Sequence, residues 1–326
     1  MSGLPAMGGT RSTFPKTSRK TAGPASVPAA FAVLALVAAS ASLILTACVR
    51  RYEPGRPTSR AAEAGTSEKT AVPASPPLPD ELAARGLSGP VRTVASRSYR
   101  PSLDGSGKPE MYLSSVLSFD SAGRFLSEVQ TDPAGKEVAR YVPRRDSAGR
   151  IVELEFRSPS GLPDGSMKLE YDDAGRMVRE SYFGADGRSS GGYLYEYGPG
   201  DRPARKSMRT EYEDGSVRTN RTDYRYDEDG LLIEETISDE SLGGVVLRIE
   251  HAYQNGRRVR SSDFQRGRWL EFLTFYEHDS RGNVVREASY QIPESEYGDS
   301  FSSVTSENGI PKSFLASFVE TEYEYH

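Results

Sequence analysis

The sequence repeats a short turn motif at nearly regular intervals, and this repeat limits the folds open to the chain. The clearest copy is the stretch Tyr171-Asp172-Asp173-Ala174-Gly175-Arg176. Related stretches begin at Phe119, Arg145, Tyr197, Tyr226, Tyr253 and Tyr276, so that the steps between lead residues are 26, 26, 26, 29, 27 and 23. Such a period is typical of a chain built from stacked copies of one supersecondary unit.

Asp and Gly keep fixed places in these copies and supply turn chemistry. An Asp side chain hydrogen-bonds to the backbone of its own turn, and Gly adopts positive φ without steric cost. A second set of glycine turns lies between the copies, so each unit is predicted to be a β-hairpin. The residues predicted to form the repeat turns are Asp120, Gly123, Asp146, Gly149, Asp172, Gly175, Asp227, Gly230 and Gly282.

Between the turns, aromatic or apolar residues alternate with charged ones. Tyr193, Tyr195 and Tyr197, for example, alternate with Leu194 and Glu196. A period of two predicts half-buried antiparallel strands. The chain is therefore expected to be all-β, an antiparallel meander of about six to eight repeated hairpins in a curled or twisted open sheet.

An open sheet has two edge strands, and exposed edges promote aggregation unless they are capped or curled. The candidate edges are residues 91–99 and 314–325. If these two segments met, the array would close on itself.

The N-terminal region has the order of an export signal. Residues 1–47 contain four basic residues and no acidic ones, and an apolar run from Val27 to Ala47 leads to Cys48, the only cysteine. This pattern predicts a secretory signal peptide, with an uncleaved membrane helix as the alternative. Residues 48–85 are rich in Pro, Ala and Ser and are predicted to be a disordered tether, and residues 86–326 form the repeat domain.

The segment Leu45-Thr46-Ala47-Cys48 resembles the bacterial lipobox. The resemblance implies that Cys48 becomes the mature N-terminus and carries lipid, with palmitate among its acyl chains. The second mature residue is Val49 rather than Asp, which in a diderm bacterium implies release to the outer membrane. Whether the domain faces the periplasm or the cell surface stays open.

The pattern Tyr-Asp-x-x-Gly, followed by Arg or Asn and two apolar residues, resembles the YD (Rhs-type) repeat of bacterial surface proteins over about residues 119–290. The family implies β-hairpin arrays and roles in surface display, carbohydrate binding or toxin encapsulation. This chain is too short to enclose a cargo, and it looks more like the small YD-repeat lipoproteins. The resemblance favours a non-catalytic binding or scaffold module for an envelope protein partner. Association with a toxin system is a weaker alternative.

Catalysis, metal binding and nucleic-acid binding have little support. His251 alternates with Ile249 and Tyr253, which predicts a packed side chain, and no recognised catalytic motif is present. The turn at Asp227 resembles the start of a calcium loop but lacks the later ligands of an EF-hand. The formal net charge of −5 argues against nucleic acid as a partner. No cofactor and no catalytic residue is expected.

Aromatic side chains are the candidates for ligand binding. A row of strand tyrosines can stack on the sugar rings of a glycan or of peptidoglycan, or contact a protein. The alternative is cross-strand packing. The possible ligand-binding residues are Tyr193, Tyr195, Tyr197, Tyr224, Tyr226 and Trp269.

Overall fold

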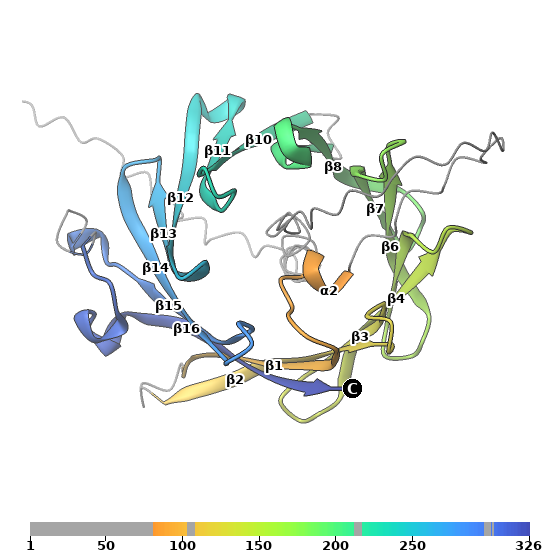
Figure 1. The fold of residues 1–326 in the computed structure, drawn as a ribbon, viewed down its shortest axis with the longest axis horizontal. Coiled ribbons are helices and arrows are strands. Elements are labelled where there is room, and N and C mark those ends of the chain that lie inside the picture. Colours follow the sequence, from red (N-terminus) through yellow and green to blue (C-terminus); the bar gives the residue numbers. More distant parts are fainter. Residues whose placement is uncertain (1–80, 103–107, 212–216, 297–300, 302) are drawn as a thin grey trace, which may run out of the picture. The chain divides into compact units, whose positions relative to one another are not determined.

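The computed structural model describes residues 81–326, except for 103–107, 212–216, 297–300 and 302 (Figure 1). The predicted signal peptide, Cys48 and most of the predicted tether lie outside the described residues.

The described part of the chain is a meander of antiparallel strands with one short α-helix before it (Figure 1). Glycine turns separate strands of alternating pattern, as the repeat predicted. The elements are α2 (Glu81–Ala84), β1 (Val91–Pro101), β2 (Pro109–Phe119), β3 (Phe125–Thr131), β4 (Glu137–Arg145), β5 (Ile151–Arg157), β6 (Pro163–Tyr171), β7 (Met177–Gly184), β8 (Ser189–Tyr197), β9 (Pro203–Glu211), β10 (Val217–Tyr226), β11 (Leu232–Asp239), β12 (Gly244–Gln254), β13 (Arg257–Gln265), β14 (Trp269–His278), β15 (Val284–Gln291) and β16 (Leu315–Tyr325). Short 3₁₀ turns are η1 (Pro199–Asp201), η2 (Glu240–Leu242), η3 (Glu294–Glu296), η4 (Glu307–Gly309) and η5 (Lys312–Phe314).

The sheet closes into a barrel of sixteen strands, so the prediction of an open sheet is wrong. The two segments predicted as edges, β1 and β16, pair antiparallel with each other, with Val94 opposite Tyr323. The rings of Tyr99 and Phe318 stack across this seam with centroids 4.5 Å apart. Each neighbouring pair of strands in a sheet is rotated by its twist, and a long curled meander can return its last strand to its first. Closure satisfies both edges, which removes the aggregation hazard.

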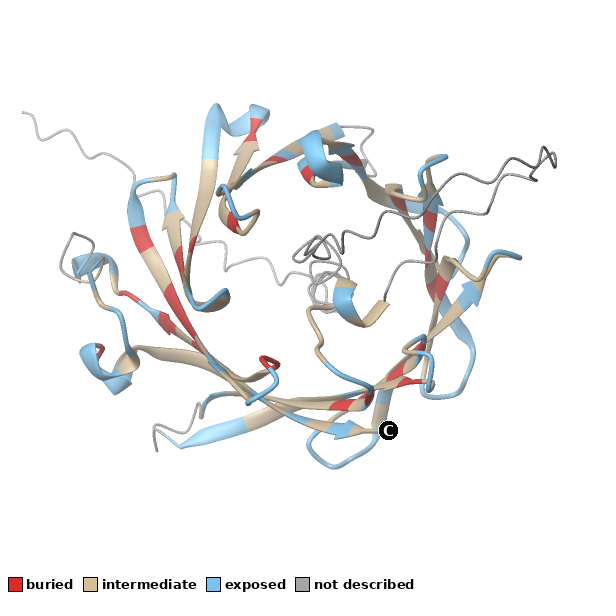
Figure 2. Ribbon diagram, viewed as in Figure 1, coloured by how far each residue is buried: buried red, intermediate tan, exposed pale blue. Residues whose placement is uncertain are grey.

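The inner face of the barrel carries the first of two apolar clusters. Its members include Phe125, Tyr141 and Met167, each at most 1% exposed. Helix α2 lies inside the ring (Figure 1), and its Leu82 packs against this cluster. Because successive strand residues point to opposite faces, the apolar positions of the repeat point into the ring. Figure 2 shows buried positions interspersed along the strands around it.

The outer face carries a ladder of opposite charges. In each pair the Arg and the Glu stand directly opposite each other on neighbouring strands, on either side of one turn of the repeat set. The pairs are Arg144–Glu153 (2.7 Å), Glu170–Arg179 (3.9 Å), Glu196–Arg205 (3.2 Å), Arg225–Glu234 (2.9 Å) and Glu277–Arg286 (2.8 Å). The repeat therefore encodes a charged outer wall as well as an apolar inner one.

A second apolar cluster lies on the outer face, beneath the long connection between β15 and β16. Leu273 and Ala288 are both completely buried there and pack with Ile310 of the connection. Glu307 of the connection accepts a hydrogen bond from the Tyr290 hydroxyl at 2.8 Å. The connection thus covers an apolar patch, and Arg286 of the charged ladder pairs with Glu307 at its border.

Candidate functional site

The Asp-x-x-Gly turns form one rim of the barrel and share one geometry. The Asp172 amide donates to the Arg176 carbonyl, and the Gly175 amide donates to the Asp172 carbonyl, both at 2.9 Å. Oδ1 of Asp172 accepts from the Arg176 amide at 2.9 Å, and Oδ2 accepts from Arg176 Nε at 2.8 Å. Gly175 has φ of 80°, a conformation that favours glycine. The same backbone closure occurs in the turns that begin at Asp120, Asp146, Asp227 and Asp279, with positive φ at Gly123, Gly149, Gly230 and Gly282.

These contacts keep the turn carboxylates ionised. Burial alone would raise the pKa of Asp172, but hydrogen bonds from Arg176 outweigh it and the pKa is lowered. The pKa values of Asp120, Asp146 and Asp279 are lowered by the same balance of burial and hydrogen bonds. These carboxylates therefore stabilise the turns by accepting hydrogen bonds within them.

The repeat tyrosines join each unit to the one before it. In each case the hydroxyl donates to the carbonyl at the start of a strand in the preceding unit. The bonds are Tyr171 to Ile151 (2.8 Å), Tyr197 to Met177 (2.7 Å), Tyr226 to Pro203 (2.9 Å), Tyr253 to Leu232 (2.9 Å) and Tyr323 to Val284 (2.7 Å). The turn arginines add a cation–π contact, such as Arg176 over the Tyr197 ring at 4.9 Å. Tyr197 and Tyr226, two of the predicted ligand contacts, thus hold neighbouring repeats together.

Tyr193 and Tyr195 lie on the inner wall beside a buried carboxylate. Glu180 is 1% exposed and accepts hydrogen bonds from the hydroxyls of Tyr195 and of Tyr182, the latter at 2.9 Å. Burial raises the pKa of Glu180, against the lowering effect of the two hydroxyls. Nζ of Lys206 lies 4.4 Å from the centroid of the Tyr193 ring. Both tyrosines therefore contact side chains of the barrel wall itself, Tyr195 through Glu180 and Tyr193 through Lys206.

A chain of hydrogen bonds on the inner wall includes a Ser, a His and a Glu. His251 contacts Glu235 through Nε2 at 3.1 Å and Ser261 through Nδ1 at 2.8 Å, and the Ser261 hydroxyl lies 3.2 Å from that of Tyr276. Tyr224 stands opposite Glu235 on the next strand. Such a set can activate a nucleophile, but Ser261 is only 4% exposed and sits within a regular strand. The chain of bonds satisfies polar groups that the wall buries.

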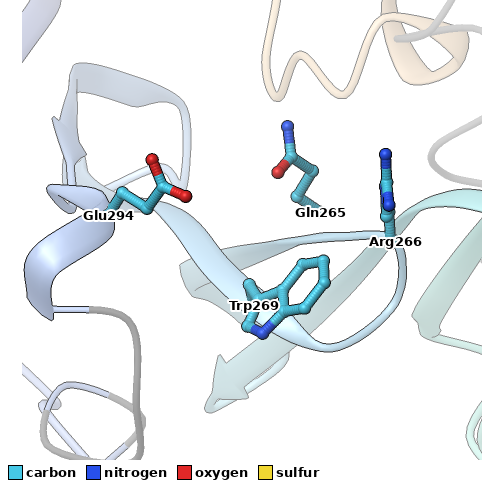
Figure 3. Close-up of a pocket in the computed structure, with 4 residues that line it drawn as sticks. All are labelled: Gln265, Arg266, Trp269 and Glu294. Carbon is cyan, nitrogen blue, oxygen red and sulfur yellow. The ribbon is translucent and has the colours of Figure 1, made fainter. Parts of the chain in front are cut away.

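Trp269 lies at the other rim, where β13 turns into β14. Its side chain is exposed at 42%, and with Gln265, Arg266 and Glu294 it lines a hollow of about 540 Å³. Figure 3 shows these four side chains around one open space, with Glu294 reaching it from a separate segment. We call the hollow the Trp269 groove.

The β13–β14 hairpin fixes the shape of the Trp269 groove. Arg266 and Gly267 both adopt positive φ, 49° and 69°. The Gly267 amide donates to the Phe264 carbonyl at 3.0 Å, and the Arg266 amide donates to the Val246 carbonyl of β12 at 2.9 Å. The turn is therefore tied both to itself and to the neighbouring strand.

A larger hollow continues from the Trp269 groove. It measures about 860 Å³ and shares Gln265, Arg266 and Trp269 with the groove, and Arg248 and Arg268 also line it. The two hollows together form an exposed surface of aromatic, amide and guanidinium groups.

The structure separates the six predicted ligand-binding residues. The five tyrosines line the strands of the barrel wall, whereas Trp269 stands apart at the opposite rim. Sequence reasoning did not identify Gln265, Arg266, Arg268 or Glu294. The run Arg266-Gly267-Arg268 immediately before the Trp was a signal for the cationic part of this site. Nothing local in the sequence could show that Glu294 lies beside it.

Among the residues that the structure describes, no helix is long and apolar enough to cross a bilayer.

No family model matches the chain, and no curated protein sequence matches it. Among solved structures, the chain is similar to a Photorhabdus luminescens Tc holotoxin pore, with a TM-score of 0.28 and 11% identity over 60% of this chain and 13% of that one. It is also similar to a porin-like protein from Bacteroides uniformis, with a TM-score of 0.31 and 12% identity over 73% and 98% of the two chains. An exported protein with a YmcC-like fold from Bacteroides fragilis gives a TM-score of 0.24 and 9% identity over 72% and 97%. At these scores nothing about the function of this chain follows from the similarity.

Proposed function

We propose that the protein is a lipid-anchored, non-catalytic binding module of the bacterial cell envelope, with its barrel in water rather than in the bilayer. The observation that carries this is the charged outer wall. A barrel that faces lipid presents an apolar band about 25 Å tall, with girdles of aromatic residues. Here the corresponding face carries the ladder of Arg–Glu pairs, with Arg225 and Glu277 each 60% exposed.

A domain with such a wall needs another means of attachment to the membrane. The lipobox resemblance supplies one at Cys48. About 32 residues between this position and α2, taken as a flexible chain, span roughly 30 Å. The domain would then stand clear of the lipid headgroups, as a small YD-repeat lipoprotein of the outer membrane in a diderm cell.

Binding, rather than catalysis, is favoured by where the polar groups lie. The groups with catalytic potential on the inner wall, Ser261, His251 and Glu235, are buried against one another. The groups around Trp269 are exposed and surround an open hollow. Binding sites are concave, and a few convergent polar groups in them fix the orientation of the ligand.

Replacement of Cys48 by Ala tests the anchor in a producing bacterial cell. The wild-type chain should incorporate labelled palmitate and sediment with membranes. The Cys48→Ala variant is made with residues 1–47 replaced by a signal peptide that is cleaved without lipidation, so that no apolar segment remains, and it should lose the label and be recovered in the soluble fraction. The neighbouring Val49→Ala variant is the matched control and should behave as wild type. Cys48→Ala protein that remains with membranes after an alkaline carbonate wash would show that the barrel itself is embedded, and the proposal would fail.

A further inference from the structure

Two arginines of the barrel stand without a side-chain partner. Among the described residues, every arginine except Arg266 and Arg268 takes part in an ion pair, a hydrogen bond, a ring contact or another electrostatic interaction of its side chain. Arg266 and Arg268 are both exposed, and both line the hollows around Trp269. In a chain whose net charge is −5, two free guanidinium groups two residues apart mark a place for an anion.

An exposed aromatic ring lies beside these two arginines. Trp269 is the only tryptophan of the chain, and an exposed indole offers a large flat apolar surface. The amide of Gln265 and the carboxylate of Glu294 flank it (Figure 3). An amide and a carboxylate both bind hydroxyl groups, the carboxylate as acceptor and the amide as donor and acceptor.

These groups together describe a ligand with an apolar face, hydroxyls and a negative charge. Resting on the proposed role as a binding module, we propose that the Trp269 groove binds an acidic saccharide. One face of a pyranose ring lies on the Trp269 indole, and its carboxylate or phosphate lies at Arg266, which lines both the groove and the larger hollow that Arg268 also lines. Gln265 and Glu294 contact the ring hydroxyls. The volume of about 540 Å³ falls within the range of small-ligand sites and accommodates one or two sugar rings.

An acidic protein segment would use the same arginines, but the hollow favours the sugar. Interface hot spots lie in desolvated pockets and belong to contact areas of about 800 Å² per partner. The Trp269 groove is instead lined by a charged carboxylate and a charged guanidinium beside the ring. Glu294 accepts hydrogen bonds from hydroxyl groups, which a sugar ring carries and a segment of Asp and Glu residues lacks.

The single tryptophan allows binding to be read directly. The full chain in detergent is titrated with tetragalacturonate, and the emission of Trp269 is followed. The expected result is a saturable change that weakens as NaCl is raised from about 50 to about 500 mM. The methyl ester of the same tetrasaccharide, which differs only in charge, should bind about tenfold more weakly or not at all. Mannose 6-phosphate replaces the uronate in a second titration, and separates phosphorylated from carboxylated sources of the ligand.

Substitutions in the groove test which side chains contact the ligand. Arg266→Gln and Arg268→Gln should each weaken binding of tetragalacturonate about tenfold without change in the thermal midpoint. Arg225→Gln, which removes an exposed but paired arginine far from the groove, is the matched control and should bind as wild type. Trp269→Phe keeps an aromatic plate and should bind more tightly than Trp269→Ala when both are measured by calorimetry.

Three outcomes overturn the inference. They are no saturable binding of either anionic sugar, binding of the methyl ester as tight as that of tetragalacturonate, and binding by Arg266→Gln and Arg268→Gln as tight as that of the wild type. A polyglutamate peptide that binds with the same dependence on Arg266 and Arg268, while the sugars do not, would also overturn it and would identify a peptide site. Each result is independent of the Cys48 experiment, so failure here leaves the lipid-anchored module standing.

Discussion

Two turns of the same rim differ in the contacts of their fifth residue, counted from the turn Asp. Arg176 in the Asp172 turn is partly exposed and bonds to its own turn and to the next repeat, where it contacts Asp201 and the Tyr197 ring. Asn283 in the Asp279 turn is completely buried, and its side chain exchanges hydrogen bonds with the backbone of Ser88 at 2.6 and 3.1 Å. It also donates to the Tyr325 hydroxyl at 2.9 Å. The regular turn contacts the next repeat along the chain, whereas the turn at the seam joins the beginning of the domain to its end.

A second exception teaches the same lesson. Arg145 stands at the position before the turn Asp, where Phe119, Tyr171 and Tyr226 stand in other repeats. Its guanidinium donates to the Phe125 carbonyl at 2.7 Å, as the Tyr171 hydroxyl does to Ile151. The charge that this introduces is matched by Glu81 of α2. Where the motif departs from its rule, a residue outside the repeats completes the site.

The largest effect should follow from a change at the seam. Asn283→Ala removes the hydrogen bonds of this side chain to Ser88 and Tyr325 and leaves buried partners unsatisfied, which should lower the free energy of unfolding by about 3 kcal/mol. Arg124→Ala changes the same turn position in a regular repeat, where the side chain is 53% exposed, and should cost far less. Urea unfolding followed by circular dichroism measures both. Equal losses would mean that the seam is no different from any other turn.

The next largest effect should come from the exception at Arg145. Glu81→Gln removes the charge beside a guanidinium that is only 21% exposed, and should cost about 2 kcal/mol of unfolding free energy. The double variant Glu81→Gln with Arg145→Tyr restores the residue of the regular repeat. It should recover most of that loss, as measured by urea unfolding. A double variant no more stable than Glu81→Gln would refute the idea that Arg145 replaces a repeat tyrosine.

The contrast between regular turns and the seam also explains which features could be predicted from the sequence. The period, the turns at Asp120 to Asp279 and the alternation followed from local chemistry, and the all-β meander is confirmed. Closure pairs β1 with β16 and brings Asn283 against Ser88, 195 residues away, and no local pattern encodes contacts at that distance. The same holds for Glu294 in the Trp269 groove. Trp269 itself could be named from the sequence, but whether its ring is covered depends on the separate connection that follows β15.

The inner wall should respond to pH differently from the turns. Because burial raises the pKa of Glu180, the folded state binds its proton more tightly than the unfolded chain does. The resulting loss of stability begins as pH rises through the unfolded value of about 4.3 and grows up to the folded pKa. Glu180→Gln should remove this loss, so that the difference in unfolding free energy between variant and wild type increases from pH 4 to pH 7. A difference that stays constant across this range would contradict the raised pKa.

Loss of the tyrosine hydroxyl should lower stability by a similar amount in each regular repeat. Tyr171→Phe, Tyr197→Phe and Tyr226→Phe each remove one hydroxyl and leave one backbone carbonyl unsatisfied. Each should lower the free energy of unfolding by about 1 kcal/mol. Because the three sites lie in separate units, the triple variant should lose the sum, as measured by thermal and urea unfolding. A triple loss well above the sum would show that the ladder acts as one cooperative unit.

The smallest effect belongs to the outer ladder, and it decides which solvent this wall meets. Arg225 and Glu234 pair directly across two strands, with Arg225 60% exposed, so Arg225→Gln should cost about 0.5 kcal/mol and less in high salt. Exchange of the two residues, Arg225→Glu with Glu234→Arg, keeps the pair and should restore the stability. Replacement of both residues by Leu should have opposite effects according to whether the outer wall faces water or lipid. In water the Leu pair adds an exposed apolar patch and should promote aggregation, as seen by light scattering, whereas in lipid it removes two desolvated charges and should stabilise the barrel. A Leu variant that stays monomeric and gains stability only in detergent micelles would therefore place the outer wall in the membrane.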